Sequence, residues 1–288
     1  MNKRAFEDIW KRSLPEGGFA ARPGGRYRAD STAWAIVAMR ACGIEAQRLQ
    51  TARQRLSADQ QPDGRVTLST ELPGSFWPTP LAVLAWQSCP EFSLARSRAV
   101  SFLLNTAGHH FRRAADSPAG HDTSIPGWPW IEGTHSWVEP TSLAMIALRT
   151  AGHGSHERVS DGARLLLDRQ LSRGGWNYGN TTVFGTELAP MPESTGLALS
   201  ALPGLASREA VSRSIALMKD AVRSLKTPIS LGWAILGLSA WGERPGDADD
   251  LIDRCLGRQS RYGAYDTSMV GLMIVARKAE GGLLDAFA

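Results

Sequence analysis

The chain has 288 residues, of which 43% are hydrophobic and 21% charged, and its formal net charge at pH 7 is +4. This length and apolar content are enough to bury one large core or two small ones. No run of about eighteen apolar residues is present, so no transmembrane helix is expected, and basic residues alternate with acidic ones, which argues against nucleic-acid binding.

The start of the chain, residues 2–12, is a charged amphipathic segment without the apolar centre of a secretory signal peptide. We therefore expect a cytoplasmic protein, for which peripheral contact with a membrane surface remains compatible with the sequence. The three cysteines, Cys42, Cys89 and Cys255, lie far apart, unlike those of a disulfide framework or a zinc knuckle. They are predicted to be buried, reduced thiols.

Two kinds of helical segment alternate along the chain. The first is amphipathic and charged, which is typical of helices with one face in solvent. These predicted outer helices are residues 2–12, 44–60, 91–108, 155–171, 207–225 and 247–259. The second is rich in small residues and almost uncharged, which is typical of helices buried on all sides. These predicted inner helices are residues 30–43, 79–89, 139–152, 193–204, 230–242 and 266–278.

Six outer-inner pairs predict an all-α fold, a closed α6-α6 barrel or α/α toroid, with parallel inner helices that begin at one mouth. Residues 1–288 are expected to form a single domain. Residues 109–137, between the third outer and inner helices, far exceed the usual helix connection of about 2–8 residues. We expect this insertion to be a lid.

A glutamine, a glycine and an aromatic residue recur where outer helices end. Gln170, Gly174 and Trp176 have the spacing Q-x3-G-x-W. Glycine can end a helix in a left-handed turn, and the aromatic ring can pack on the next hairpin. The pattern returns, with substitutions, at Gln259, Gly263 and Tyr265, at Gln60, Gly64 and Val66, and at Ser13, Gly17 and Phe19.

This repeat resembles that of the terpenoid cyclase and protein prenyltransferase α/α toroids, also called the prenyltransferase and squalene-oxidase repeat, with its QW motif. The resemblance extends over essentially the whole chain, although only the segment from Gln170 to Trp176 matches the motif fully. It implies the toroid fold, and it specifies the reaction poorly because function resides in the site.

Class II terpene cyclases of this family protonate an alkene with the middle aspartate of a D-x-D-D-T-A motif. The similar segment here is R-A-D-S-T-A, residues 28–33, in which Asp30 takes the place of the protonating aspartate. Arg28 and Ser31 replace the two flanking carboxylates, and this puts squalene or diphosphate cyclisation of the usual kind in doubt.

Other motifs of the family are not convincingly present. The acidic runs at 247–250 and 249–253 open an outer helix, where the helix dipole accounts for them. The zinc ligands of the protein prenyltransferases cannot be assembled, because Asp266 stands where the resemblance requires histidine. The sequence therefore predicts neither a metal nor a cofactor.

Acidic residues stand at the start of four predicted inner helices. Each is explained singly as a helix cap or a partner of the helix dipole. Together they face one mouth, where crowded carboxylates raise one another's pKa and so provide a general acid. The candidate catalytic residues are Asp30, Glu139, Glu193 and Asp266, with His135 as an acid-base partner of Glu139.

Aromatic and basic residues surround the same mouth. The aromatic rings either fill the barrel or line a pocket that stabilises a carbocation through their π faces, and the sequence leaves both readings open. The candidate substrate-binding residues are Trp34, Trp77, Trp128, Trp130, Trp137, Trp233 and Tyr265, together with Arg28, Arg112 and Arg113, which could hold an anionic head group.

The favoured hypothesis is a terpene-cyclase-like enzyme that uses general acid catalysis on a hydrophobic, isoprenoid substrate in the barrel. Two alternatives stay open. One is a non-catalytic lipid- or protein-binding toroid that has lost the aspartate-rich motif. The other is a carbohydrate-active α/α barrel with paired carboxylates at its mouth.

Overall fold

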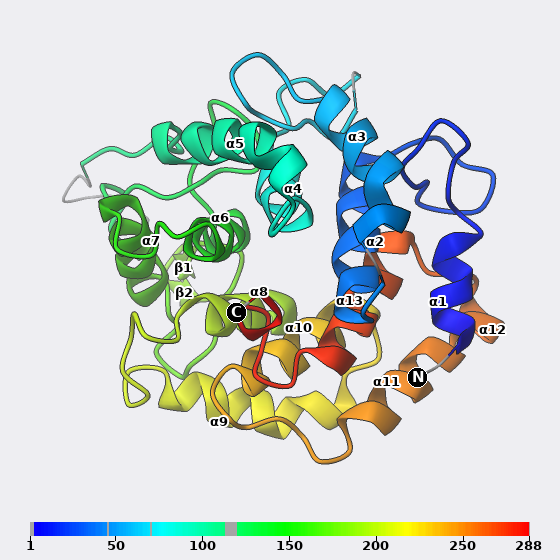
Figure 1. Cartoon of the computed structure of the whole chain (residues 1–288). Helices are drawn as coiled ribbons and strands as arrows, with labels where there is room; N and C mark the ends of the chain where they lie inside the picture. The colour runs from blue at the N-terminus through cyan, green and yellow to red at the C-terminus, as the bar shows by residue number, and fades with distance from the viewer. Residues whose placement is uncertain (1–2, 45, 70, 113–119, 288) are drawn as a thin grey trace.

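Two concentric rings of helices make up the computed structural model, which describes residues 3–44, 46–69, 71–112 and 120–287 (Figure 1). The inner ring consists of α2 (Ala29–Ala41), α4 (Pro78–Ala85), α6 (Val138–Thr150), α8 (Pro192–Ala201), α10 (Pro228–Ser239) and α13 (Thr267–Lys278). The outer ring consists of α1 (Lys3–Trp10), α3 (Gln50–Ala58), α5 (Ser93–Asn105), α7 (Glu157–Asp168), α9 (Ser212–Ala221) and α11 (Ala248–Gly257).

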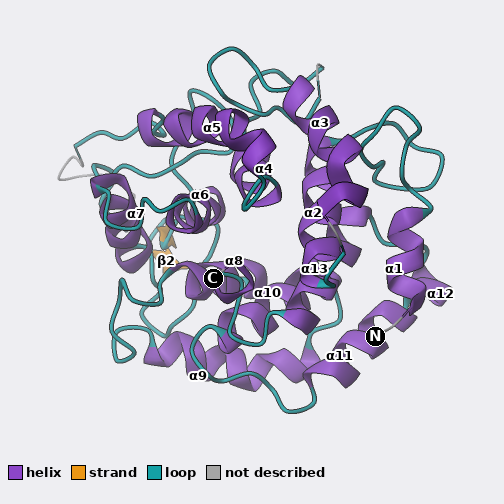
Figure 2. Cartoon of the chain, in the orientation of Figure 1, coloured by secondary structure: helices purple, strands orange, loops and turns teal. Residues whose placement is uncertain are grey.

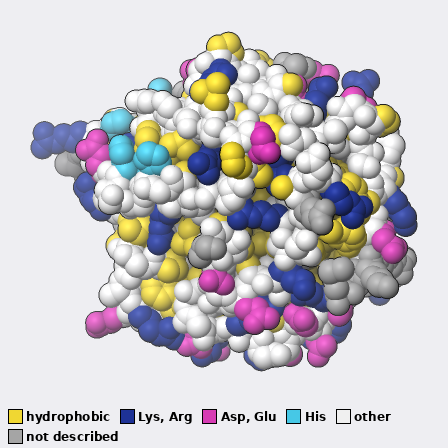
Figure 3. Space-filling model, in the orientation of Figure 1, with side chains coloured by type: hydrophobic (Ala, Val, Ile, Leu, Met, Phe, Trp, Pro, Cys, Tyr) yellow, Lys and Arg dark blue, Asp and Glu magenta, His cyan; other side chains and the backbone are white. Residues whose placement is uncertain are grey.

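The inner ring is closed. Each inner helix contacts the next one along the chain, and α13 contacts α2, while each outer helix packs on an inner one. The predicted α/α toroid of six outer-inner pairs is therefore confirmed for the described part of the chain. On the face drawn in Figure 3, side chains of both charges are interspersed, as expected for solvated outer helices.

Small residues let the inner helices approach one another closely. A Cβ atom on Gly196 of α8 would lie 2.3 Å from the backbone of Trp233 in α10, and one on Gly237 would lie 2.5 Å from the carbonyl oxygen of Gly196. Helix backbones at this distance leave no room for a side chain. Gly196 and Gly237 are thus required by the close packing of α8 on α10.

Short elements lie between the helices of the two rings, and one more follows the last inner helix. They are the 3₁₀ helices η1 (Ala46–Leu49), η2 (Pro90–Phe92), η3 (Val222–Ser224) and η4 (Asp285–Phe287), the short helix α12 (Gln259–Tyr262) and the hairpin of β1 (Thr182–Val183) and β2 (Thr186–Glu187) (Figure 2). The sequence did not predict the hairpin. In the described residues, no helix has the length and hydrophobicity needed to cross a membrane.

In the copies of the recurring motif at Gly17, Gly64 and Gly174, the glycine lies against the next outer helix. Gly64 and Gly174 have φ values of +98° and +95°, which favour glycine. A Cβ atom on them would lie 2.2 Å from the Arg98 carbonyl oxygen and 2.6 Å from the Arg213 carbonyl carbon. The glycine therefore both turns the chain and brings neighbouring outer helices together.

A threonine in the first turn of an inner helix anchors the residue at the aromatic position of the motif. Its hydroxyl oxygen accepts a hydrogen bond from the backbone N–H of that residue, so a buried donor is satisfied. The pairs are Thr32 with Phe19 (2.9 Å), Thr79 with Val66 (2.9 Å), Thr141 with Trp128 (3.0 Å) and Thr195 with Trp176 (3.0 Å).

The first and last repeats meet at a seam that is held by hydrogen bonds. The buried guanidinium of Arg12 donates to the Tyr265 carbonyl (2.8 Å) and to the Thr267 hydroxyl (3.2 Å). The Thr267 backbone N–H donates to the Ala21 carbonyl at 2.9 Å. These bonds complete the ring where no chain connection crosses it.

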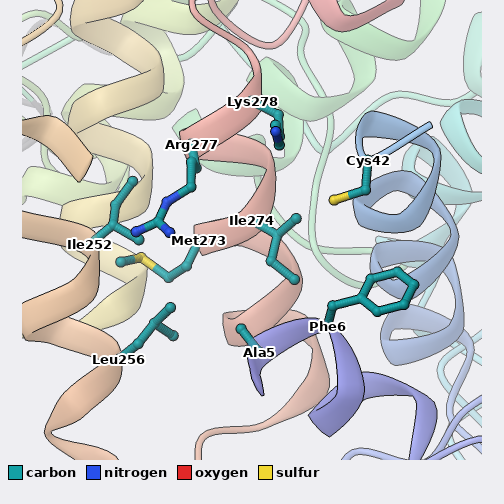
Figure 4. A pocket seen from close by; sticks show the side chains of 9 residues that line it. All are labelled: Ala5, Phe6, Cys42, Ile252, Leu256, Met273, Ile274, Arg277 and Lys278. Atoms are coloured by element: carbon teal, nitrogen blue, oxygen red, sulfur yellow. The ribbon is translucent and has the colours of Figure 1, made fainter. Parts of the chain in front are cut away.

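Helix α1 packs beside this seam (Figure 4). Ala5 and Phe6 of α1 face Ile274 of α13 and Leu256 of α11, and the gap among them has a volume of about 20 Å³. A space of that size holds about one water molecule. It is a gap in the packing and not a ligand site.

Candidate functional site

A cavity of about 390 Å³ lies at the end of the barrel where the inner helices begin. Every inner helix contributes to its wall, and the insertion adds one residue. Its volume falls within the range of about 300–1,000 Å³ that is usual for small-molecule sites. The lining residues are Asp30, Trp34, Trp77, Leu81, Trp130, Glu139, Leu143, Leu197, Ile229, Trp233, Ser268, Met269 and Leu272.

Two pairs of tryptophans form much of the wall. Trp34 of α2 and Trp233 of α10 meet edge to face, with ring centroids 5.8 Å apart and an interplanar angle of 70°. Trp77, just before α4, and Trp130 of the insertion meet at 5.8 Å and 80°. The sequence-based expectation that Trp34, Trp77, Trp130 and Trp233 surround one pocket therefore agrees with their placement.

Glu139 is the acidic residue of α6 that lines this cavity. Its Oε1 accepts a hydrogen bond from the Ser194 hydroxyl at 2.8 Å. Burial raises the pKa of Glu139, and the nearby charge of Glu193 adds to this increase, whereas the hydrogen bond from Ser194 acts in the opposite direction. A carboxyl group in this setting retains its proton to higher pH than an exposed glutamate does.

Glu193 and Tyr178 lie beside Glu139 at the mouth. Glu193 accepts a hydrogen bond from the Ser230 hydroxyl of the next inner helix at 2.8 Å. The pKa of Tyr178 is raised by desolvation and by the charges of Glu193 and Glu139. The Tyr178 backbone also accepts a hydrogen bond from the Val138 N–H at the start of α6 (2.8 Å).

Sequence reasoning did not include Tyr178 in the site. The one feature of the sequence that points to Tyr178 is its position two residues after Trp176, in the segment that leads to helix α8 and its Glu193. That position alone does not show which side chains the hydroxyl meets.

Asp30 lines the cavity in the arrangement expected from the R-A-D-S-T-A segment, but with a strong partner. Arg28 Nε donates to Asp30 Oδ1 at 2.9 Å, and Arg28 Nη2 donates to Asp30 Oδ2 at 2.8 Å. The Asp30 side chain is only 5% exposed, whereas that of Arg28 is 40% exposed. Both oxygens of Asp30 thus already accept hydrogen bonds from a guanidinium, and Arg28 is occupied by this pair.

Asp266 and Tyr265 lie away from the cavity wall. Asp266 Oδ1 accepts a hydrogen bond from Arg22 Nε at 2.8 Å, near the surface. The Tyr265 hydroxyl donates to the Cys255 carbonyl at 3.1 Å, and its backbone N–H donates to Gln259 Oε1 at 2.8 Å. Tyr265 therefore ties the motif to the end of α11. Neither residue lines the cavity, although the pKa of Arg28 is raised by its hydrogen bonds to Asp30 and also by the charge of Asp266.

Comparison with solved structures identifies many chains of similar fold, of which two are described here. One is a protein from Actinoplanes, with a TM-score of 0.61 and 16% identity over 96% of this chain and 98% of that chain. The other is a variant of the type II terpene cyclase MstE from Scytonema in complex with its substrate, geranylgeranyl dihydroxybenzoate. Its TM-score is also 0.61, with 14% identity over 99% of this chain and 96% of that chain.

The chain has a terpene-cyclase-like fold. At these identities the likeness shows the fold alone. No protein-family model matches the sequence, and no curated protein matches it either.

The insertion of this terpene-cyclase-like toroid builds a second, smaller cavity of about 220 Å³. His135 and Trp137 line this cavity together with Arg169, and the ring of His135 lies 5.7 Å from that of Phe111. The predicted partnership of His135 with Glu139 is thus not what the geometry shows, because His135 lies in a different pocket. Trp137 faces the same second cavity.

Trp128 was predicted to lie at the rim of the mouth, but the structure buries it between the two rings of helices. It is 1% exposed, and its indole N–H donates to the Leu103 carbonyl at 2.9 Å. Trp176 makes the equivalent bond to the Leu166 carbonyl at 2.6 Å. Trp128 is therefore the motif aromatic of the third repeat and fills the wall between the rings.

The remaining candidates are peripheral. Arg112 is exposed, and Arg113 lies outside the described residues. The acidic runs at 247–253 open α11, where Asp249 and Asp253 form ion pairs with arginines. Among the described residues, no group of three or more histidine, cysteine or acidic side chains is arranged to hold a metal ion.

Proposed function

We propose that this protein is a terpene-cyclase-like enzyme that acts by general acid catalysis on an isoprenoid substrate in the central cavity, with Glu139 as the acid. The observation that carries the proposal is the placement of Glu139, a half-buried carboxyl group whose pKa is raised by desolvation, in a cavity walled by two tryptophan pairs. A general acid and a surface suited to a carbocation thus face the same space.

The chemistry follows from these groups. The proton of the Glu139 carboxyl group passes to one alkene carbon, whose π electrons form the new C–H bond, and the adjacent carbon becomes a cation. The cation can then react with further double bonds of the chain. Loss of a proton, or capture by water, ends the reaction and leaves a product isomeric with the substrate or its hydrate.

Tryptophan faces stabilise such a cation by about 0.5–2 kcal/mol per contact. Trp34 and Trp233 sit deep in the cavity, at 6% and 5% exposure, where little water competes for the cation. We propose that they serve this role, and that Trp77 and Trp130 hold the rest of the hydrocarbon chain.

In this proposal Asp30 is not the proton donor. A proton donor needs a free carboxyl O–H, and both Asp30 oxygens accept from Arg28. We propose that the pair shapes the mouth and offers the exposed side of Arg28 to a polar head group. We propose also that the chain is a cytoplasmic member of the terpenoid cyclase and prenyltransferase family and that its repeat is the QW repeat of that family.

The Arg28–Asp30 pair also supports the second candidate, a toroid that binds a lipid without turnover. The carbohydrate-active barrel is less favoured, since leucine, isoleucine, methionine and tryptophan side chains dominate the cavity wall.

The test is product analysis by mass spectrometry after incubation with farnesyl diphosphate, geranylgeranyl diphosphate, squalene and geranylgeranyl dihydroxybenzoate. We expect an isomer or hydrate of one substrate from the native protein and none from Glu139→Gln. Asp30→Asn is the comparison variant, and both should keep their circular dichroism spectra. Turnover that persists in Glu139→Gln and stops in Asp30→Asn would transfer the acid role to Asp30.

Binding is measured separately by thermal shift. A ligand at a hundred times its Kd adds about 2.7 kcal/mol of stability, which raises the melting temperature by several degrees. A shift without any product would establish the binding toroid. Flat curves with every isoprenoid would overturn both candidates.

A further inference from the structure

Exposed apolar side chains gather at one end of the barrel. In the described part of the chain, every exposed large hydrophobic residue except Leu94 lies in, or within two residues of, a segment that leads from an outer helix to an inner one. These segments share the end at which the cavity lies. Representative residues are Leu72, Ile131, Phe184 and Tyr262, which are 52%, 49%, 93% and 65% exposed.

The most exposed of these residues occupies a turn that does not suit it. Phe184 and Gly185 form the loop of the β1–β2 hairpin, with φ values of +49° and +76°. A two-residue hairpin loop with both φ values positive favours Asn-Gly, and a bulky residue at its first position is strained. Because 93% of its surface is exposed, Phe184 gains no compensating contact within the fold.

The surroundings of this rim favour a lipid surface as the partner. Arg26, Arg112 and Arg261 are exposed in the same connecting segments, and of these Arg26 lies 4.0 Å from the exposed Glu71. Basic residues beside apolar ones are typical of proteins that lie on anionic membranes. Ile229 is 41% exposed and also lines the central cavity, so the apolar rim continues into the pocket.

A second copy of the chain fits this surface less well. A stable dimer buries about 800 Å² per partner on a continuous patch. Here the apolar side chains stand singly around a ring of loops, and the hairpin places Phe184 at its tip. Such an arrangement suits insertion into the boundary between head groups and acyl chains.

We propose that the end of the barrel that carries the cavity docks on an anionic lipid bilayer, with Phe184 as an inserted anchor. The inference does not depend on turnover. It places the opening of the cavity against the phase in which a hydrophobic ligand is dissolved.

The test is co-sedimentation of the full chain with phosphatidylcholine vesicles, with and without phosphatidylglycerol. Phe184→Asn is the informative variant, because asparagine suits the turn and should leave the melting temperature unchanged or higher. Leu94→Asn is the matched control, since Leu94 is 72% exposed at the opposite end.

We expect the native chain to bind the vesicles, more tightly when phosphatidylglycerol is present. Phe184→Asn should lower the partition coefficient about ten- to a hundredfold, the factor for burial of one large apolar side chain, and Leu94→Asn should have no effect. Equal partition of the two variants, or no binding of the native chain to either vesicle, would overturn the proposal. A dimer without lipid that Phe184→Asn converts to a monomer would also overturn it, in favour of a subunit interface.

Discussion

Replacement of Gly174 by alanine tests how the rings are held together, and Gly263 provides a matched control. Both glycines occupy the same position in the repeat, with φ values of +95° and +92°. A Cβ atom on Gly174 would lie 2.6 Å from the Arg213 carbonyl carbon in α9, whereas one on Gly263 would meet nothing within 4 Å. The two variants share the backbone strain and differ in the clash.

The magnitudes follow from these two effects. Alanine at a φ near +90° costs about 1–3 kcal/mol, which both variants incur. The clash with the backbone of α9 adds about 1–3 kcal/mol for Gly174→Ala alone, because a helix backbone cannot rotate away as a side chain can. At about 2–4 °C per kcal/mol for a domain of this order of size, Gly174→Ala should melt about 2–12 °C below Gly263→Ala.

The assay is thermal unfolding of both variants and the native protein, followed by circular dichroism at one pH. If the two variants melt at the same temperature, contact of the motif glycine with the next outer helix does not stabilise the ring. The explanation of the repeat given above would then be wrong.

Three further predictions concern single side chains. The folded-state pKa of Glu139 is raised, so the contribution of this carboxyl group to the stability of the fold is present below its unfolded-state pKa and is lost as the pH rises through its folded-state pKa. Glutamine carries no charge at any pH. Glu139→Gln should therefore raise the melting temperature at pH 8 relative to the native protein and change it little at pH 4. Thr141→Val should cost about 1–3 kcal/mol in denaturant titrations, because the buried Trp128 N–H loses its partner; no loss would mean that another acceptor replaces it. Arg12→Gln should speed amide exchange of Thr267 more than that of helices remote from the seam, and uniform exchange rates would contradict this role.

The fold was predictable because two helix compositions alternate with a clear period. Burial on all sides removes charge from the inner helices, and burial on one face leaves it on the outer ones. The β1–β2 hairpin was missed because a two-residue strand has too little periodicity to detect. Its Phe184-Gly185 turn also lacks the usual asparagine or aspartate before glycine.

The insertion concealed the third repeat. The glutamine-based spacing fails there, so Trp128 was assigned to the rim. A different spacing would have found it, since Phe19, Val66 and Trp128 each precede their threonine by thirteen residues. The same hydrogen bond joins Trp176 to Thr195 across nineteen residues, so the spacing of thirteen is shared by the other three pairs only.

The candidate site was predictable in part. The pattern of acids at helix starts predicted that Glu139 and Asp30 lie at one end of the barrel, and both line the same cavity there. It did not distinguish them, because the pairing of Asp30 with Arg28 and of Glu139 with Ser194 depends on side-chain direction and on a neighbouring helix. Partners remote in sequence leave no local pattern.

The seam between the first and last repeats gives the toroid one joint unlike the others. Neighbouring repeats elsewhere are connected by the chain, whereas at the seam no chain connection exists: α13 packs on α1 and α2, and Arg12 and Ala21 form hydrogen bonds with Thr267 and Tyr265. Separation at this joint breaks no peptide bond and unfolds no helix. The packing of α13 on α1 and α2 and the hydrogen bonds of Arg12 therefore replace, at this one joint, the chain connection that keeps the other repeats side by side.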